Sequence, residues 1–164
     1  MQIRPETVSD ISQIEAVTLA AFATAAYSNH REQLIIAALR RSRRLAVSMV
    51  ADLEGMVVGH AAASPVAISD GTAPWYGLGP VSVAPGYQRR GFGAELVRAV
   101  LHALEQDRAA GCVVLGEPDY YRRFGFCRRA DLRLPGVPVE YFQARAFGRG
   151  WPSGDVTYDA AFGV

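Results

Sequence analysis

The chain has 164 residues, half of them hydrophobic and a fifth charged, and 17 Lys+Arg residues nearly balance 16 Asp+Glu residues. This length and composition predict one globular domain over residues 1–164, and the formal net charge of +1 argues against a nucleic-acid-binding protein. The sequence lacks a run of about 18 apolar residues, so no membrane-spanning helix is expected. Residues 1–6 lack the basic and apolar regions of a signal peptide, and we therefore expect a cytoplasmic protein.

The first quarter of the chain is predicted to hold one strand and two helices. Ile3 begins the strand, and Ser9 or Asp10 is expected to cap the first helix, where apolar residues recur at helical spacing. Asn29, with Glu32 three residues later, resembles a capping box at the start of the second helix.

Three strands are predicted next. Residues 45–51 and 56–63 are expected to form a hairpin that turns at residues 52–55. Residues 66–77 are predicted to be a polar loop containing Gly and Pro, and residues 78–83 a short apolar strand. A helix, a strand, a short helix and further strands follow, and this order predicts an α/β domain with a mixed sheet.

The segment 78–93 has the sequence of an anion-binding turn. Its apolar strand ends at the Pro-Gly pair 85–86, and one apolar stripe with helical periodicity begins at Phe92. The first N–H groups of a helix have no intrahelical partner and lie at the positive end of its dipole. Because Gly91 and Gly93 lack a Cβ, an oxyanion can approach the backbone, and a ligand rich in phosphate is expected.

Two common nucleotide-binding motifs do not fit this turn. Gly86 and Gly91 have the spacing of a P-loop, but Phe92-Gly93 replaces the Lys-Ser/Thr pair that should follow. The dinucleotide fingerprint G-x-G-x-x-G is also absent. The remaining sequence, Gln88-Arg89-Arg90-Gly91-Phe92-Gly93, resembles the diphosphate-binding motif [Gln/Arg]-x-x-Gly-x-[Gly/Ala] of the GNAT acetyltransferase superfamily, whose members bind acetyl-coenzyme A.

A second signature occurs in the expected order. Residues 116–126 read Gly-Glu-Pro-Asp-Tyr-Tyr-Arg-Arg-Phe-Gly-Phe and resemble the superfamily pattern aromatic-Tyr-x-x-[Leu/Phe]-Gly-Phe. Residues 136–142 and 156–162 resemble one bacterial branch of predicted N-acetyltransferases. The resemblance covers residues 3–162 and implies an α/β fold of GNAT type, with a mixed, mostly antiparallel central sheet flanked by helices.

The resemblance also implies an activity. The expected reaction transfers the acetyl group of acetyl-CoA to a primary amine of a small molecule or peptide. No strong acyl-accepting nucleophile is visible, so direct attack in a ternary complex is expected. No nucleic-acid or membrane partner is expected, and the superfamily's frequent dimers leave a homodimer open.

The superfamily motifs imply which residues hold the cofactor. Backbone groups of Val81, Ser82 and Val83 would pair with the pantetheine arm as another strand would. The diphosphate would contact amides around the six residues of the first signature, namely Gln88, Arg89, Arg90, Gly91, Phe92 and Gly93.

The second signature implies a general acid. Tyr121 matches the tyrosine that many members use, and a phenol with a reference pKa of about 10 is protonated at neutral pH and can donate to a thiolate. The alternative is that Tyr121 only packs against the cofactor. Tyr120, Arg123 and Phe124 are expected to line the cofactor arm or the core.

The general base is left open by the sequence. Many members carry a Glu or Asp on the strand that corresponds to residues 78–83, and this chain has none there. His60 and Glu117, each acting through water, are the candidates, with Glu140 as a third. His60 could instead be a hydrogen-bonded core residue.

The acceptor pocket is expected around Tyr27 and the segments 66–77 and 136–142. Four aromatic residues there could form a wall that favours a flat or cationic amine, or could pack in the core: Trp75, Tyr76, Tyr141 and Phe142.

Two rival functions remain in view. One is an acyltransferase that uses a longer acyl-CoA, and the other is a non-catalytic acyl-CoA-binding or regulatory module, suggested by the missing strand carboxylate. Cys112 is expected in the core and Cys127 is not expected to act as a nucleophile. Two Cys and three scattered His give no metal-binding spacing, so no metal is expected.

Overall fold

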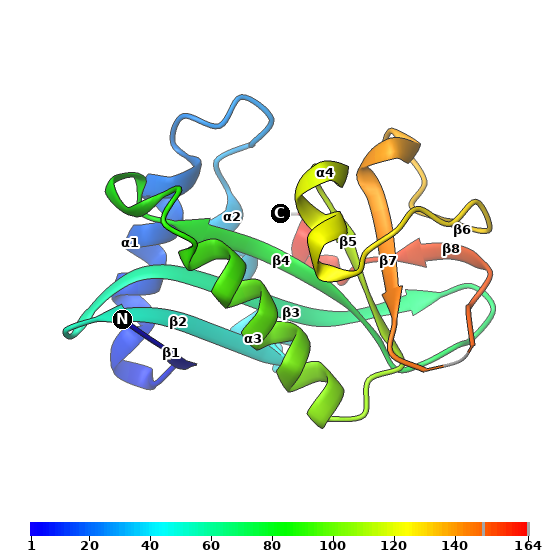
Figure 1. Cartoon of the computed structure of the whole chain (residues 1–164), viewed down its shortest axis with the longest axis horizontal. Helices are drawn as coiled ribbons and strands as arrows, with labels where there is room; N and C mark the ends of the chain where they lie inside the picture. The colour runs from blue at the N-terminus through cyan, green and yellow to red at the C-terminus, as the bar shows by residue number, and fades with distance from the viewer. Residues whose placement is uncertain (149, 164) are drawn as a thin grey trace.

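The centre of the protein is a twisted sheet with the strand order β1-β2-β3-β4-β5-β7, seen in a computed structural model that describes residues 1–148 and 150–163 (Figure 1). The strands are β1 Gln2–Pro5, β2 Val47–Leu53, β3 Met56–Ile68, β4 Trp75–Val83, β5 Gly111–Leu115 and β7 Phe142–Ala146. Neighbours along this path are antiparallel except for the parallel pair β4–β5. The expected mixed, mostly antiparallel sheet is confirmed.

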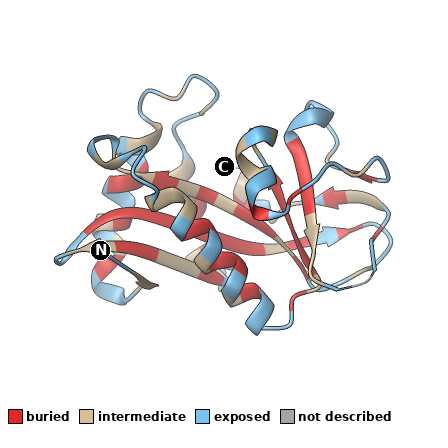
Figure 2. Ribbon diagram, in the orientation of Figure 1, coloured by how far each residue is buried: buried red, intermediate tan, exposed pale blue. Residues whose placement is uncertain are grey.

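Helices cover both faces of this sheet. They are α1 Ile11–Phe22, α2 Glu32–Arg41, α3 Phe92–Gln106 and the single turn α4 Pro118–Tyr121. The apolar stripe of α3 is buried against β2, β3 and β4 on one face, as its periodicity predicted, while α1 and α2 pack on the other face (Figures 1 and 2). No helix among the described residues combines the length and apolarity needed to cross a bilayer.

The predicted hairpin of β2 and β3 is confirmed, with a tighter turn than expected. Only Glu54 and Gly55 separate the two strands, and both have positive φ, at 51° and 89°. A two-residue turn of this kind matches the right-handed twist of the strands it joins. The N–H of Gly55 also donates to the carboxylate of Asp52 over 2.7 Å, so the turn satisfies its own polar group.

The loop predicted at residues 66–77 is wrong at both ends. β3 runs on to Ile68 and β4 starts at Trp75, which leaves only residues 69–74 between them. Val66, Ile68 and Trp75 are buried in a second core cluster together with Val156. Val156 belongs to the short strand β8 Gly154–Thr157, which pairs with the end of β3 and with β6 Leu132–Arg133. Strand pairing from the distant C-terminal segment thus overrides the polar composition.

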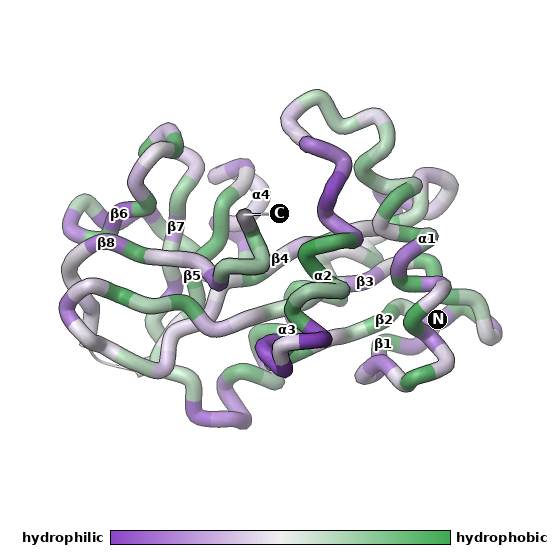
Figure 3. Tube along the Cα trace, turned by 180° about the vertical axis from the view of Figure 1, so that it is seen from behind, coloured by the Kyte–Doolittle hydropathy of each residue, from purple (hydrophilic) through white to green (hydrophobic). Residues whose placement is uncertain are grey.

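The capping box predicted for α2 is also wrong. Arg31 is the residue before the helix, and Asn29 instead accepts the N–H of Arg31 over 3.0 Å in a local turn. The Glu32 carboxylate is engaged by the hydroxyl of Ser28, so it cannot reach back to cap the helix. The segment is hydrophilic where it enters α2 (Figure 3), and these side chains bond to one another rather than to the helix end.

Candidate active site

The sheet opens between β4 and β5. Their last parallel pair joins Leu78 to Val114. Beyond this point β4 continues to Val83 alongside β3, while β5 continues alongside β7. Among the described strands, none pairs with the other edge of β4 over residues 79–83. The backbone polar groups of that edge can therefore pair with an extended ligand, as strand addition does elsewhere.

A β-bulge explains where the sheet opens. The register between β3 and β4 shifts so that Gly79 and Pro80 together lie opposite the single residue Ala62. Gly79 has a φ of 132°, and Pro80 has no N–H to donate to either neighbouring strand. A bulge bends its strand and increases the local twist, so β4 turns away from β5 directly after Leu78.

The three β4 residues predicted to hold the pantetheine arm line this edge. Val81 and Val83 point toward the α3 side and pack against its core cluster. Ser82 points to the opposite face and is buried, and its hydroxyl has no hydrogen-bond partner within residues 1–148 and 150–163. Backbone polar groups alternate between the two edges of a strand, so those of Val81 and Val83 face the open edge and those of Ser82 face His60 of β3.

The turn from β4 into α3 leaves the start of the helix uncapped. After a 3₁₀ turn at Pro85–Tyr87, Arg89 has a φ of 64° and Gly91, the residue preceding the helix, has a φ of 85°. In the part of the chain that the structure describes, no side chain caps α3. The side-chain amide of Gln88 instead donates from its Nε2 to the Val83 backbone carbonyl over 3.0 Å. The first amides of α3 therefore remain available to an anion, next to the open edge of β4.

The two glycines of this turn serve different needs. A Cβ at Gly91 would meet nothing within 4 Å, so its role is the left-handed backbone conformation. A Cβ at Gly93 would lie 3.3 Å from the hydroxyl of Tyr120, so its role is to leave room between α3 and α4. Tyr120 thus lies over the first turn of α3, and Phe124 is buried in the core cluster beneath it.

Tyr121 is held rigidly at the opposite side of the gap. A Cβ at Gly116 would overlap its ring, so the glycine at the end of β5 is required for the ring to occupy this position. The ring packs edge-on against Phe126 with centroids 5.9 Å apart. Burial raises the pKa of Tyr121 well above its ordinary value, which keeps the phenol protonated.

Glu117 lies beside Tyr121, at the end of β5. It is the residue preceding α4, and its backbone carbonyl accepts the N–H groups of Tyr120 and Tyr121 over 3.2 and 3.1 Å. Its side chain makes no capping hydrogen bond to the helix. The backbone of Glu117 therefore lies next to Tyr121, while the residue itself is exposed.

His60 lies away from the gap, beneath α1. It is 0% exposed and lies opposite Ser82, with its Nε2 2.8 Å from the hydroxyl of Ser48. The Ser48 hydroxyl donates its proton to Glu6, so it accepts from the Nε2–H of His60. Burial lowers the pKa of His60 to about 4, and the imidazole is neutral at pH 7. These contacts fit the alternative interpretation of His60 as a hydrogen-bonded core residue rather than a general base.

The aromatic residues predicted to form an acceptor wall do not all reach the gap. Trp75 and Phe142 are buried in the second core cluster, where pairing with neighbouring strands directs them inward. Tyr141 is 38% exposed and Tyr27, between α1 and α2, is exposed as well. The exposed aromatic surface therefore comes from two loops rather than from one strand.

One residue near the gap was not identified from the sequence. Tyr158 is partly buried, its ring lies 3.1 Å from where a Cβ of Gly77 would be, and its buried hydroxyl has no hydrogen-bond partner among the described residues. Burial raises its pKa strongly. Gly77 precedes the last β4–β5 pair, so Tyr158 lies beside the point where the strands separate. Its position depends on the C-terminal segment that follows β8, and no local pattern predicts it.

Comparisons with known proteins agree on one family. The model of the acetyltransferase (GNAT) family matches residues 11–126. The chain is 35% identical over 142 residues, 84% of its own length and 82% of the relative's, to an uncharacterized N-acetyltransferase, YhbS, of Escherichia coli strain K12.

Two solved structures extend this agreement to the whole fold. A GNAT family acetyltransferase from Brucella melitensis in complex with acetyl-CoA is 48% identical, with a TM-score of 0.87 over 98% of this chain and 97% of that one. Escherichia coli YhbS in complex with CoA is 30% identical, with a TM-score of 0.88 over 99% and 92% of the two chains.

Proposed function

The chain belongs to the GNAT acetyltransferase family, and on that premise we propose that it transfers the acetyl group of acetyl-CoA to a primary amine by direct attack. The Brucella relative binds acetyl-CoA and Escherichia coli YhbS binds CoA, which supports acetyl-CoA as the donor. Direct attack is supported by the state of Cys112, since burial raises the pKa of its thiol to about 12 and removes it as an acyl-accepting nucleophile.

The observation that carries the proposal is the continuity of two features. The open edge of β4 leads directly into the uncapped turn of α3. An extended arm that pairs with the outward-facing backbone groups of Val81 and Val83, on either side of Ser82, would deliver a diphosphate to the amides of residues 88–93. Each dipole-type contact contributes about 0.3–1 kcal/mol and more when partly buried, so several together anchor the donor.

We assign the role of general acid to Tyr121. The amine nitrogen attacks the thioester carbon, the carbon–sulfur bond breaks, and the departing thiolate takes the proton of the Tyr121 hydroxyl. The proton lost by the nitrogen passes through water to a general base and from that base back to the phenolate, so the products are an amide and free CoA. Burial of Tyr121 supports this role because it keeps the phenol protonated until the thiolate forms.

For the base we favour Glu117 acting through water. Its carboxylate makes no capping contact with α4, the residue is exposed, and its backbone carbonyl accepts the N–H of Tyr121. His60 is the other candidate, but its buried position and its pKa of about 4 make it a poor acceptor for the proton of an amine.

Release of CoA thiol in the presence of an amine panel tests the proposal. We expect thiol to accumulate with acetyl-CoA and at least one primary amine, and Glu117→Gln to slow this release without weakening acetyl-CoA binding. Tight binding with no thiol release across the panel would instead support a non-catalytic acyl-CoA-binding module. Faster release from a longer acyl-CoA would identify a different donor.

A further inference from the structure

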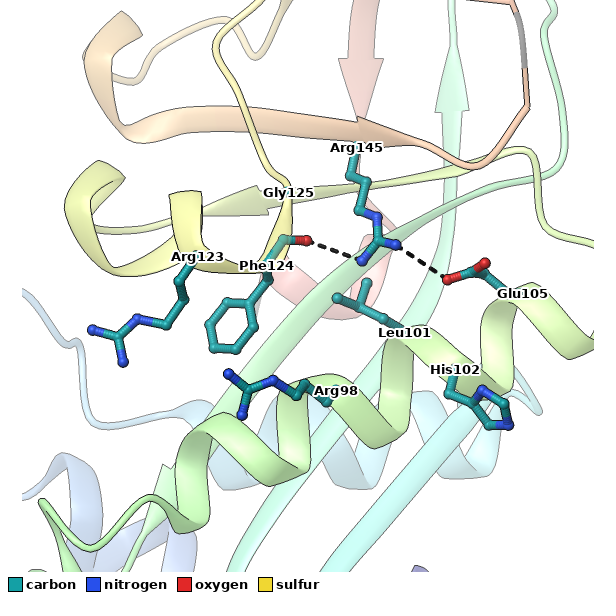
Figure 4. A pocket seen from close by; sticks show the side chains of 8 residues that line it. All are labelled: Arg98, Leu101, His102, Glu105, Arg123, Phe124, Gly125 and Arg145. Carbon is teal, nitrogen blue, oxygen red and sulfur yellow. Dashed lines mark hydrogen bonds and ion pairs between the residues drawn. The ribbon is translucent and has the colours of Figure 1, made fainter.

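A pocket of about 420 Å³ lies between α3 and the segment that follows α4 (Figure 4). One wall is a face of α3, and the other is formed by the 3₁₀ turn Arg122–Phe124, by Gly125 and by Arg145 of β7. Three arginines line it against one glutamate, so the pocket has an excess of positive charge. The roles proposed above do not use it.

Arg145 is fixed within the protein. One of its terminal nitrogens donates to the Phe124 carbonyl over 2.9 Å, and the other lies 3.3 Å from the carboxylate of Glu105 (Figure 4). A Cβ at Gly125 would lie 3.3 Å from the Arg145 side chain, so this glycine leaves room for it. Arg145 and Glu105 therefore neutralise each other at the closed end of the pocket.

Arg98 and Arg123 are not neutralised in this way. Neither forms an ion pair with a carboxylate anywhere in residues 1–148 or 150–163. The guanidinium of Arg98 lies 5.2 Å from the ring centroid of Phe124, and that of Arg123 lies 4.6 Å from that of Tyr120. Figure 4 shows both guanidinium groups directed to the same side of the pocket, near the Phe124 ring. Aromatic faces orient the two cations while leaving terminal N–H groups for a ligand.

This arginine pair adjoins the first turn of α3. Arg123 lies over the Tyr120 ring itself, and the Phe124 ring that Arg98 contacts packs against Tyr120 with centroids 5.4 Å apart. The same hydroxyl lies 3.3 Å from the Cβ position of Gly93. Helical side chains lean toward the N-terminus, which carries the Arg98 guanidinium from its own turn toward the start of α3.

We propose that Arg98 and Arg123 bind the 3′-phosphate of coenzyme A, one ribose away from the diphosphate. This inference rests on the proposed use of acetyl-CoA. A phosphate monoester carries close to two negative charges at neutral pH, and two arginine forks from different elements match its oxygens. The pair acts as a clamp between α3 and the segment after α4, so the same contact holds these elements together around the donor.

Calorimetric titration with CoA and with dephospho-CoA, which lacks only the 3′-phosphate, tests the proposal. We expect the wild-type protein to bind CoA at least about 10-fold more tightly, as charged hydrogen bonds of this kind provide. Arg98→Gln and Arg123→Gln should each reduce that preference to a few-fold by weakening CoA binding and leaving dephospho-CoA binding unchanged.

Arg122→Gln is the matched control. Arg122 is the neighbour of Arg123 in the sequence, and it is exposed and paired with Asp119. Its substitution by Gln removes the same charge as Arg123→Gln. It should keep the wild-type preference for CoA. Equal wild-type affinity for the two ligands would overturn the proposal while leaving the proposed function intact. The proposal would also be overturned if Arg98→Gln weakened the binding of CoA and dephospho-CoA equally. That result would place the arginine at the diphosphate, which both ligands contain. Failure of the wild-type protein to bind either ligand would overturn the proposed function itself.

Discussion

Two turns of this protein use the same backbone device for opposite purposes. The β2–β3 turn has Gly55 at a φ of 89°, and the β4–α3 turn has Gly91 at a φ of 85°, each preceded within two residues by a non-glycine residue with positive φ. In the first turn the Gly55 N–H is bonded to Asp52. In the second, no side chain caps the helix. A left-handed glycine alone therefore does not mark a site, whereas backbone donors left without partners do.

The contrast extends from the turns to the strands behind them. At the β2 side of the sheet, Glu6, Ser48 and His60 form a hydrogen-bonded chain under α1, in which only the Nδ1 of His60 lacks a partner among the described residues. At the β4–β5 side, a bulge separates the strands and leaves an edge open. Polar groups in the first region stabilise the fold, and those in the second are left for a ligand.

The largest effect is expected from introducing a charge at the open turn. Gly91→Glu should weaken acetyl-CoA binding by at least about 100-fold, because its carboxylate repels the diphosphate and displaces several charged hydrogen bonds. Calorimetry with acetyl-CoA measures this loss. Gly55→Glu is the control, since it adds the same side chain at nearly the same φ and also meets nothing within 4 Å.

Both glycine variants should lose a similar stability of about 1–2 kcal/mol, the usual cost of a left-handed L-residue. Only Gly91→Glu should lose the ligand. If the two variants bound acetyl-CoA equally well, the distinction between the turns would be wrong.

The next effect concerns the phenol at the gap. Tyr121→Phe should lower kcat by roughly 100-fold, a typical contribution of a general acid, with little change in acetyl-CoA affinity. Because burial raises the Tyr121 pKa above its ordinary value, wild-type turnover should not fall through titration of this group below about pH 10. Steady-state rates across this pH range check both statements, and unchanged kcat in the variant would leave Tyr121 a packing role only.

Local patterns were sufficient to predict the elements that carry the contiguous parts of the candidate site. The glycines at 91 and 93 and the Tyr-Tyr pair at 120–121 carry their conformational requirement or chemistry in a short motif, and the predicted strands and helices around them are confirmed. The order of elements likewise predicted the mixed sheet, because each helix and most strands have clear periodicity.

Contacts between distant segments were not predictable in the same way. Arg98 reads as an ordinary polar position of α3 until the turn after α4 is placed against it. Tyr158 packs partly buried on the second core cluster only because β8, which precedes it, pairs with the end of β3. The strand extension over residues 66–68 depends on that same pairing. In each case the deciding partner lies dozens of residues away, beyond the reach of a local pattern.

A third prediction concerns His60, which lies in the region whose polar groups stabilise the fold, and the pH dependence of the free energy of unfolding. Its folded pKa of about 4 lies below its ordinary value of 6.5, so the unfolded chain binds an extra proton between these pH values. The contribution of neutral His60 to the free energy of unfolding is therefore fully present above pH 6.5 and is lost as the pH falls toward 4. The wild-type free energy of unfolding should decrease by about 2 kcal/mol more between pH 6.5 and 5 than that of His60→Gln. Denaturant titrations at each pH measure this difference, and parallel curves would contradict it.

The smallest expected effect comes from adding a methyl group within the open turn. It tests whether the glycines there are needed for the space they leave or for their backbone conformation. Gly93→Ala places a methyl group 3.3 Å from the Tyr120 hydroxyl, so the side chain must shift by a few tenths of an ångström. Because Tyr120 also orients Arg123, we expect acetyl-CoA affinity to fall only about threefold, the scale of one weakened dipole contact. Gly86→Ala, where a Cβ meets nothing within 4 Å, should bind like the wild type. A loss at Gly86 equal to that at Gly93 would mean that backbone freedom along the whole turn, and not the space beneath Tyr120, limits binding.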